Sequence, residues 1–169
     1  PLNMALNYLA KKAECAYDED GQMARKGQII PGLLDSLESL SFYKQHGPKS
    51  LGREWFETEV KSLFNEKNIP GQLATYIEHI CLRIAAEVKN YAIGSMLITG
   101  GGTHNTFLIE NIRKHCPDLD IHIPEPLIID FKEALVFALL GLLRKHEMLN
   151  VLSSYTGAKR SSCSACLYL

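Results

Sequence analysis

Three consecutive glycines, Gly100, Gly101 and Gly102, are the residues whose type and spacing most directly suggest chemistry. They follow the apolar run of residues 96–99 and precede Asn105, where a helix is expected to begin. Glycines let a ligand approach the backbone closely, and the free N–H groups at a helix start attract negative charge. A phosphate or a ribose fits there, although a tight turn without a ligand explains the same residues. The spacing matches neither the GxGxxG dinucleotide motif nor the Walker phosphate loop, so a different nucleotide fold is needed.

A second candidate is Glu133, which stands in the first turn of an apolar helix expected over residues 131–143. The position lies beyond a predicted strand, at the end of a parallel sheet where ligands bind. A capping role explains the same carboxylate, because Asp130 could start the helix with Glu133 three residues later. Both interpretations stay open.

Other polar groups have simpler explanations. Residues 49–53 could bind an anion, and a solvated loop explains them equally well. Cys163 and Cys166 have CxxC spacing but no second pair nearby, which favours an incidental pair over a zinc site. Three further residues fit no common metal-ligand pattern and are assigned to packing or solvent: His115, Cys116 and His122.

The elements that must position these residues are mostly helical. A broad apolar stripe over residues 72–91 predicts a long helix with one buried face. Apolar runs at residues 96–99 and 120–123 predict two strands, with a helix between them over residues 105–115. This alternation is typical of a parallel α/β sheet. Two strands are few for such a sheet, so more are expected at residues 149–169 or on sequence absent from this chain. The apolar helix over residues 131–143 is expected to be buried on most sides.

Composition excludes several classes of protein. The 169 residues suggest one domain over residues 1–169. Eighteen Lys and Arg against 19 Asp and Glu give a net charge of -1, with no basic surplus to neutralise the phosphates of a nucleic acid. The longest strongly apolar stretch, residues 134–143, is about half of the roughly 20 residues that a membrane span needs. With no signal-peptide pattern and an odd number of cysteines, five, a cytoplasmic location is expected.

Several separated motifs, in this order, resemble the C-terminal part of the anhydro-N-acetylmuramic acid kinase family. They are residues 1–4, 17–22, 48–54, 99–105, 132–138 and 156–158. The resemblance extends to about Arg160, and residues 161–167 depart from the family's glycine-containing final strand.

The resemblance implies an α/β fold class: a helix-rich partial lobe of an actin/hexokinase-like (ribonuclease H-like) ATPase with a small, mostly parallel sheet. It implies ATP and Mg²⁺ as cofactors, and a nucleotide and an amino sugar as partners. The family hydrolyses and phosphorylates 1,6-anhydro-N-acetylmuramic acid to N-acetylmuramic acid 6-phosphate in peptidoglycan recycling. Its nucleotide loop is matched by Gly100, Gly101, Gly102 and Asn105. Its phosphate segment is matched by Asn3, and its sugar site is matched by Glu133.

In the family, the catalytic Asp lies just before the segment matched by residues 1–4, so it would lie upstream of residue 1, and the metal ligands are also expected outside this chain. No catalytic residue is therefore assigned, and the chain alone is expected to be inactive. Leu2 stands where the common pattern has a glycine, which narrows the approach to that loop. The alternative is a non-catalytic, helix-rich interaction domain that forms a homodimer or binds a protein partner through apolar surface.

Overall fold

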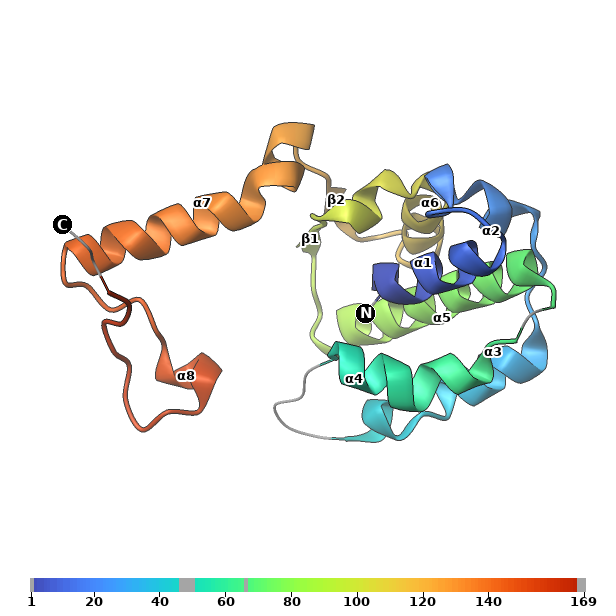
Figure 1. Ribbon diagram of the computed structural model, residues 1–169, viewed down its shortest axis with the longest axis horizontal. Helices are drawn as coiled ribbons and strands as arrows, with labels where there is room; N and C mark the ends of the chain where they lie inside the picture. The colour runs from blue at the N-terminus through green and yellow to red at the C-terminus, as the bar shows by residue number, and fades with distance from the viewer. Residues whose placement is uncertain (1, 46–50, 66, 167–169) are drawn as a thin grey trace. The chain divides into compact units, whose positions relative to one another are not determined.

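The computed structural model describes residues 2–45, 51–65 and 67–166, and its internal contacts divide the chain into two compact units (Figure 1). One unit spans Pro1–Pro124 and the other spans Glu125–Leu169. The expectation of one domain over residues 1–169 stays a prediction.

The first unit is built mainly from helices. Its α-helices are α1 (Leu2–Lys12), α2 (Gln22–Lys26), α3 (Pro31–Glu38), α4 (Arg53–Trp55), α5 (Ile69–Asn90) and α6 (Thr106–His115). Short turns of other helix types are η1 (Glu19–Gly21), η2 (Ser41–Lys44), η3 (Phe56–Val60), η4 (Lys61–Leu63) and η5 (Gly101–His104). Two strands, β1 (Ser95–Leu97) and β2 (Asp120–His122), complete the unit.

Helix α5 is the centre of the first unit, and α1, α2, α3 and α6 all pack against it. The side chain of Asn68 caps its N-terminus by accepting a hydrogen bond from the Gly71 N–H at 3.1 Å. Leu73, Tyr76 and Ile77 lie on its buried face and are almost completely removed from solvent. The long helix predicted over residues 72–91 is therefore confirmed, with its start three residues earlier.

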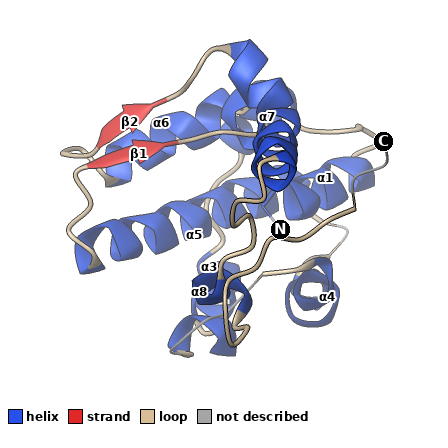
Figure 2. Ribbon diagram, turned by 90° about the vertical axis from the view of Figure 1, so that its left-hand side faces the viewer, coloured by secondary structure: helices blue, strands red, loops and turns tan. Residues whose placement is uncertain are grey.

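Strands β1 and β2 pair in parallel, and Figure 2 shows them side by side. Met96 stands opposite Ile121 in the register. The predicted strands and the helix between them are thus confirmed, although each strand is shorter than expected. The described residues show a helix-rich α/β structure with a small parallel sheet, and the actin/hexokinase-like fold stays a prediction.

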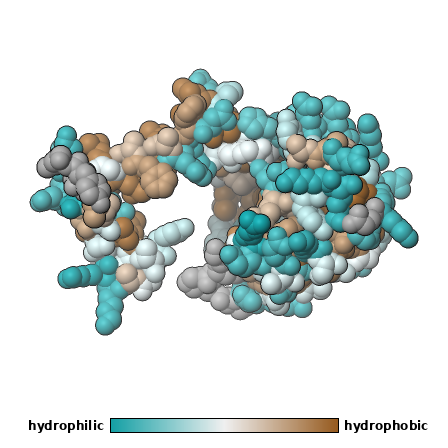
Figure 3. Space-filling view, in the orientation of Figure 1, coloured by the Kyte–Doolittle hydropathy of each residue, from teal (hydrophilic) through white to brown (hydrophobic). Residues whose placement is uncertain are grey.

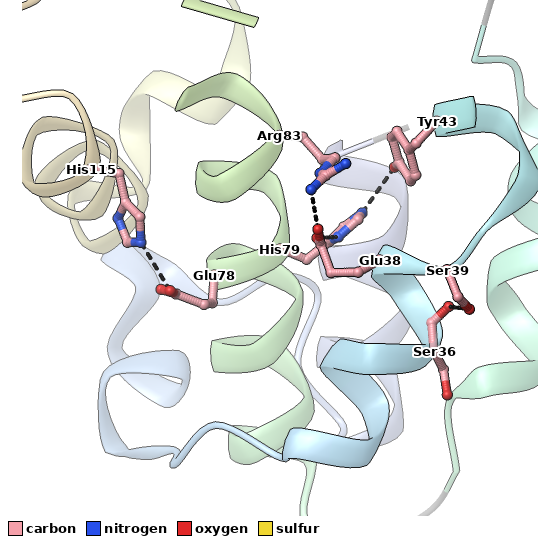
Figure 4. Close-up of polar contacts among 8 residues, drawn as sticks. All are labelled: Ser36, Glu38, Ser39, Tyr43, Glu78, His79, Arg83 and His115. Carbon is pink, nitrogen blue, oxygen red and sulfur yellow. Dashed lines mark hydrogen bonds and ion pairs between the residues drawn. The ribbon is translucent and has the colours of Figure 1, made fainter. Parts of the chain in front are cut away.

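A partly buried polar network around His79 joins α3, η2 and α5 in the first unit (Figure 4). The Glu38 carboxylate contacts both Nδ1 of the buried His79 ring and the guanidinium of Arg83. His79 Nε2 lies 2.9 Å from the hydroxyl of Tyr43. Burial lowers the pKa of His79, more than the Glu38 carboxylate raises it. Burial also raises the pKa of Tyr43 to about 12, so the hydroxyl stays protonated at neutral pH.

We expect this network to make folding stability depend on pH. The unfolded chain binds a proton at His79 near pH 6.5, whereas the folded chain binds it only at lower pH. Stability is therefore lost as pH falls from about 6.5 toward the folded pKa, with a slope of at most about 1.4 kcal/mol per pH unit for this one proton. Urea unfolding between pH 7.5 and 5 should show a shallower pH slope for His79→Gln than for the unsubstituted chain. The exposed His122→Gln is the control, and equal slopes for all three proteins would contradict the assignment.

The second unit contains α7 (Pro126–Lys145), α8 (Ser153–Thr156) and an isolated antiparallel bridge between Val151 and Ser162. Helix α7 begins at Pro126, because the fixed φ of proline suits the first helical position and its missing N–H costs nothing there. The predicted cap at Asp130 is therefore wrong. Of the strands expected at residues 149–169, the part described through Cys166 shows only the isolated bridge.

The surface of α7 is apolar, as the brown surface over this helix in Figure 3 shows. The prediction of a helix buried on most sides is wrong for the second unit described by itself, because Phe131, Leu135 and Phe137 are 59%, 60% and 70% exposed. A hydrophobic stripe recurs at alternating steps of three and four residues, which is the spacing of helix–helix contacts. Its members are Ile128, Phe131, Leu135, Ala138 and Leu142. None of the described helices is both long enough and apolar enough to cross a membrane.

Candidate functional site

The glycine turn, residues 100–102, leads out of β1 into η5 and α6. Gly100 has φ +86° and ψ 175°, a conformation that essentially only glycine adopts. Its carbonyl accepts hydrogen bonds from the N–H of Thr103 at 3.0 Å and from the Thr103 hydroxyl at 2.8 Å. These bonds hold the turn in place, while a Cβ built on Gly100 would meet nothing within 4 Å. The turn is therefore fixed but uncovered at Gly100.

A hollow of about 490 Å³ lies beside this turn in the first unit. We call it the acidic hollow, and its lining comes from α1, from residues 17–20, from η5 and from the residue that precedes α6. The lining residues are Asn3, Leu6, Asn7, Tyr17, Asp18, Glu19, Asp20, Gly101, His104 and Asn105. Three residues predicted as sites, Asn3, Gly101 and Asn105, are thus brought to one hollow from positions about a hundred residues apart in the sequence.

Asn3 lies directly against the glycine turn. A Cβ on Gly101 would come 3.1 Å from Asn3 Nδ2, and one on Gly102 would come 3.4 Å from Asn3 Oδ1. Leu2 is equally close, with its Cδ2 3.3 Å from the same position on Gly102. A side chain on this face of the turn would therefore press on α1, so the glycines allow close packing as well as ligand approach.

A second hollow, of about 620 Å³, also borders the glycine turn and is mainly apolar. Leu2, Ile80 and Met96 are among the side chains that line it, together with all three glycines. Leu2 thus lines this apolar hollow beside the turn, and a narrowed approach to the phosphate segment at this position stays a prediction.

Asn105 has a structural task of its own. Its side-chain oxygen accepts a hydrogen bond from the Leu108 N–H at 2.9 Å and so caps α6, which begins at Thr106 rather than at the glycines. The helix start predicted to attract a phosphate is therefore partly satisfied by the protein itself. Contact of Asn105 with a nucleotide stays a prediction.

Residues 18–20 supply most of the charge in the acidic hollow, and no role was predicted for them from the sequence. The buried Asp18 carboxylate accepts hydrogen bonds from the N–H groups of Met23 at 2.7 Å and Ala24 at 3.0 Å, which anchors the loop to α2. The Thr106 hydroxyl donates to the Asp20 carbonyl at 2.9 Å, which anchors it to α6. The run of three acidic residues inside one of the resembling motifs was the sequence signal that could have pointed to this loop.

Glu133 belongs to the second unit, where it is exposed on α7. It is well inside the helix, so the capping interpretation and the position in a first turn are both wrong. The proposed contact with the sugar stays a prediction.

The other candidates from the sequence do not form a metal site. His115 bonds the Asn111 carbonyl and lies 2.9 Å from Glu78, and His122 pairs with Asp120. Cys163 and Cys166 are free thiols. Among the described residues, no three His, Cys, Asp or Glu side chains come together as metal ligands. Lys49 and Ser50 of the predicted anion site lie outside the described residues.

Comparison with known proteins gives a consistent match. The family model described as anhydro-N-acetylmuramic acid kinase matches residues 1–169. A protein of that name from Aliivibrio fischeri is 32% identical over 178 residues, covering 99% of this chain and 48% of the relative. Relatives of the same name from Sulfurovum sp. and Streptomyces coelicolor are 29% and 32% identical, and this chain covers 46% and 39% of their lengths. The chain therefore spans about half, or less, of the length of these relatives.

Proposed function

Since the chain belongs to the anhydro-N-acetylmuramic acid kinase family, we propose that it is the nucleotide-binding C-terminal lobe of an ATP-dependent sugar kinase. The whole protein would hydrolyse 1,6-anhydro-N-acetylmuramic acid and phosphorylate it to N-acetylmuramic acid 6-phosphate in cytoplasmic peptidoglycan recycling. The observation that carries this proposal is the glycine turn, whose Gly101 lines a polar hollow together with Asn3.

The reaction of the family leaves this chain the role of binding the nucleotide. Ring opening by water needs a carboxylate base, and phosphoryl transfer needs the nucleotide to be held in line with the sugar. By resemblance, the base stands outside this chain, and the ligands of Mg²⁺, which neutralises the phosphates when bound, are expected there as well. What these residues can do is hold the nucleotide, because Gly101 and Asn3 line the same hollow. We therefore expect the chain alone to bind ATP and to show no turnover.

Nucleotide binding is tested by thermal unfolding with Mg-ATP. A ligand at 100 times its dissociation constant adds about 2.7 kcal/mol of stability, and we expect the midpoint to rise by several degrees. Magnesium with inorganic triphosphate at equal ionic strength is the control for unspecific anion effects. An unchanged midpoint at millimolar Mg-ATP would contradict the proposal.

A second candidate function is self-association, favoured by the exposed apolar stripe of α7. Its three-and-four spacing suits packing against a second copy of the same helix, which would make the chain a homodimer. Concentration-dependent dimerisation in sedimentation velocity, together with no response to Mg-ATP, would favour an interaction domain over a nucleotide-binding lobe.

A further inference from the structure

We propose that the acidic hollow takes the nucleoside end of the nucleotide, with Glu19 and Asp20 accepting hydrogen bonds from the vicinal hydroxyls of its ribose. The inference rests on the proposed function and adds which part of the ligand enters this hollow and which side chains select it.

The charge of the lining argues against a triphosphate in this hollow. It includes three carboxylates, from Asp18, Glu19 and Asp20, and contains no Lys or Arg. The negative charge that a polyphosphate keeps even with Mg²⁺ bound would be repelled there, because like charges in a partly enclosed site interact more strongly than in bulk water. A neutral, hydroxyl-rich group faces no such penalty, since carboxylates are strong acceptors for O–H donors.

The side chains around the hollow have unused hydrogen-bonding capacity. Within the described parts of the chain, no hydrogen bond or ion pair occupies the side chains of Glu19 and Asp20. The same holds for the amides of Asn3 and Asn7, which stand one turn of α1 apart. The hollow thus presents both free acceptors and free amide groups to a polar ligand.

The loop that carries the two carboxylates is held firmly. Asp18 anchors one side of it to α2, and Thr106 anchors the Asp20 carbonyl to α6. Gly21 follows with φ +70°, and a Cβ there would come 2.4 Å from Asn105 Oδ1. This packing fixes residues 19 and 20 relative to Asn105 and the glycine turn, so their carboxylates need little ordering when a ligand binds.

The nucleotide and the amino sugar differ in the hydroxyl groups that they could offer to Glu19 and Asp20. A ribonucleoside offers a 2′,3′-diol. In 1,6-anhydro-N-acetylmuramic acid, O1 and O6 form the anhydro bridge and O3 carries the lactyl ether, which leaves no vicinal diol. Its lactyl carboxylate would also be repelled by Glu19 and Asp20. The hydroxyls and the charge of the two ligands therefore favour the ribose over the amino sugar in this hollow.

The test compares the binding of ATP, 2′-deoxy-ATP and 3′-deoxy-ATP to the full chain by calorimetry, each with Mg²⁺. We expect ATP to bind about tenfold more tightly than either deoxynucleotide, because each analogue leaves an acceptor without its donor. In the double variant Glu19→Gln/Asp20→Asn, the ratio should fall below about threefold, because the amides lack the carboxylate charge. Asn also tolerates the left-handed backbone at position 20, where φ is +53°. Asp118→Asn removes one charge at an exposed residue outside the hollow lining and should keep the ratio.

The possible outcomes separate this inference from the proposed function. Equal binding of all three nucleotides would overturn the role of the ribose and leave nucleotide binding intact. Displacement of ATP by inorganic triphosphate at equal affinity would overturn entry of the nucleoside end. Competition with ATP by 1,6-anhydro-N-acetylmuramic acid, lost in the double variant, would assign the hollow to the sugar instead. No binding of any nucleotide would contradict the proposed function itself, and the inference with it.

Discussion

Replacing Gly27 with alanine is expected to destabilise the first unit strongly, although it adds only one methyl group. A Cβ at this position would lie 2.0 Å from the Pro70 carbonyl oxygen and 2.7 Å from the Gly71 nitrogen. These are backbone atoms in the first turn of α5, so they can move away only if α2 separates from the central helix. Overpacking of this kind costs about 3 kcal/mol or more, which corresponds to a drop in the unfolding midpoint of about 10 °C.

Gly32→Ala is the matched control for Gly27→Ala. Gly32 lies in α3, and a Cβ there would meet nothing within 4 Å. Because alanine is the better helix former, we expect Gly32→Ala to keep or slightly raise stability, by up to about 1 kcal/mol. Chemical denaturation of the unsubstituted chain, Gly27→Ala and Gly32→Ala measures these differences in stability. Equal midpoints for Gly27→Ala and the unsubstituted chain would show that α2 does not pack so closely on α5.

Replacing Gly101 with valine is expected to lower the affinity for Mg-ATP by about 100-fold or more while the chain stays folded. Gly101 does not have the positive φ of Gly100, so a side chain there causes no left-handed backbone strain, and its one close contact is with the end of the flexible Asn3 side chain. The new side chain would occupy the space beside Asn3, whose Nδ2 lies 3.1 Å from the Cβ position, and would block access to the turn backbone. Loss of this close approach removes binding rather than folding.

Gly94→Val serves as the control for Gly101→Val. Gly94 precedes β1, and a Cβ there would meet nothing within 4 Å. Both variants should melt within a few degrees of the unsubstituted chain, whereas only Gly101→Val should fail to bind nucleotide in calorimetry. Undiminished binding by Gly101→Val would mean that the nucleotide does not approach the glycine turn.

The parts of the structure that the sequence predicted are those set by local patterns. The apolar stripe over residues 72–91 predicted α5, and the apolar runs before the glycines and at Ile121 predicted the parallel pair. The turn at the three glycines was also predicted, because consecutive glycines after a strand favour backbone angles that other residues avoid. Such patterns act over a few residues and survive in the folded chain.

The remaining features depend on contacts between distant residues. The close approach of Gly27 to Pro70 is set by how two helices pack, which no local pattern encodes. The same is true of the bond from Thr106 to Asp20, which brings the acidic residues beside the glycine turn. The start of α7 was misplaced because Asp130 and Glu133 imitate a capping box, while Pro126 begins the helix earlier. Its burial was misjudged because apolar composition predicts a need for burial, not the presence of a covering surface.

Backbone amide spectra of the ¹⁵N-labelled chain during a Mg-ATP titration test most directly whether the nucleotide binds at the glycine turn. We expect saturable shifts at Gly100, Gly101 and Gly102, accompanied by Asn3 and Asp20 and sharing one dissociation constant. The amides around Arg83 on α5, outside the acidic hollow, should stay unchanged. Shifts confined to α5, or no saturable shift at the glycines while Mg-ATP is in millimolar excess, would contradict the account.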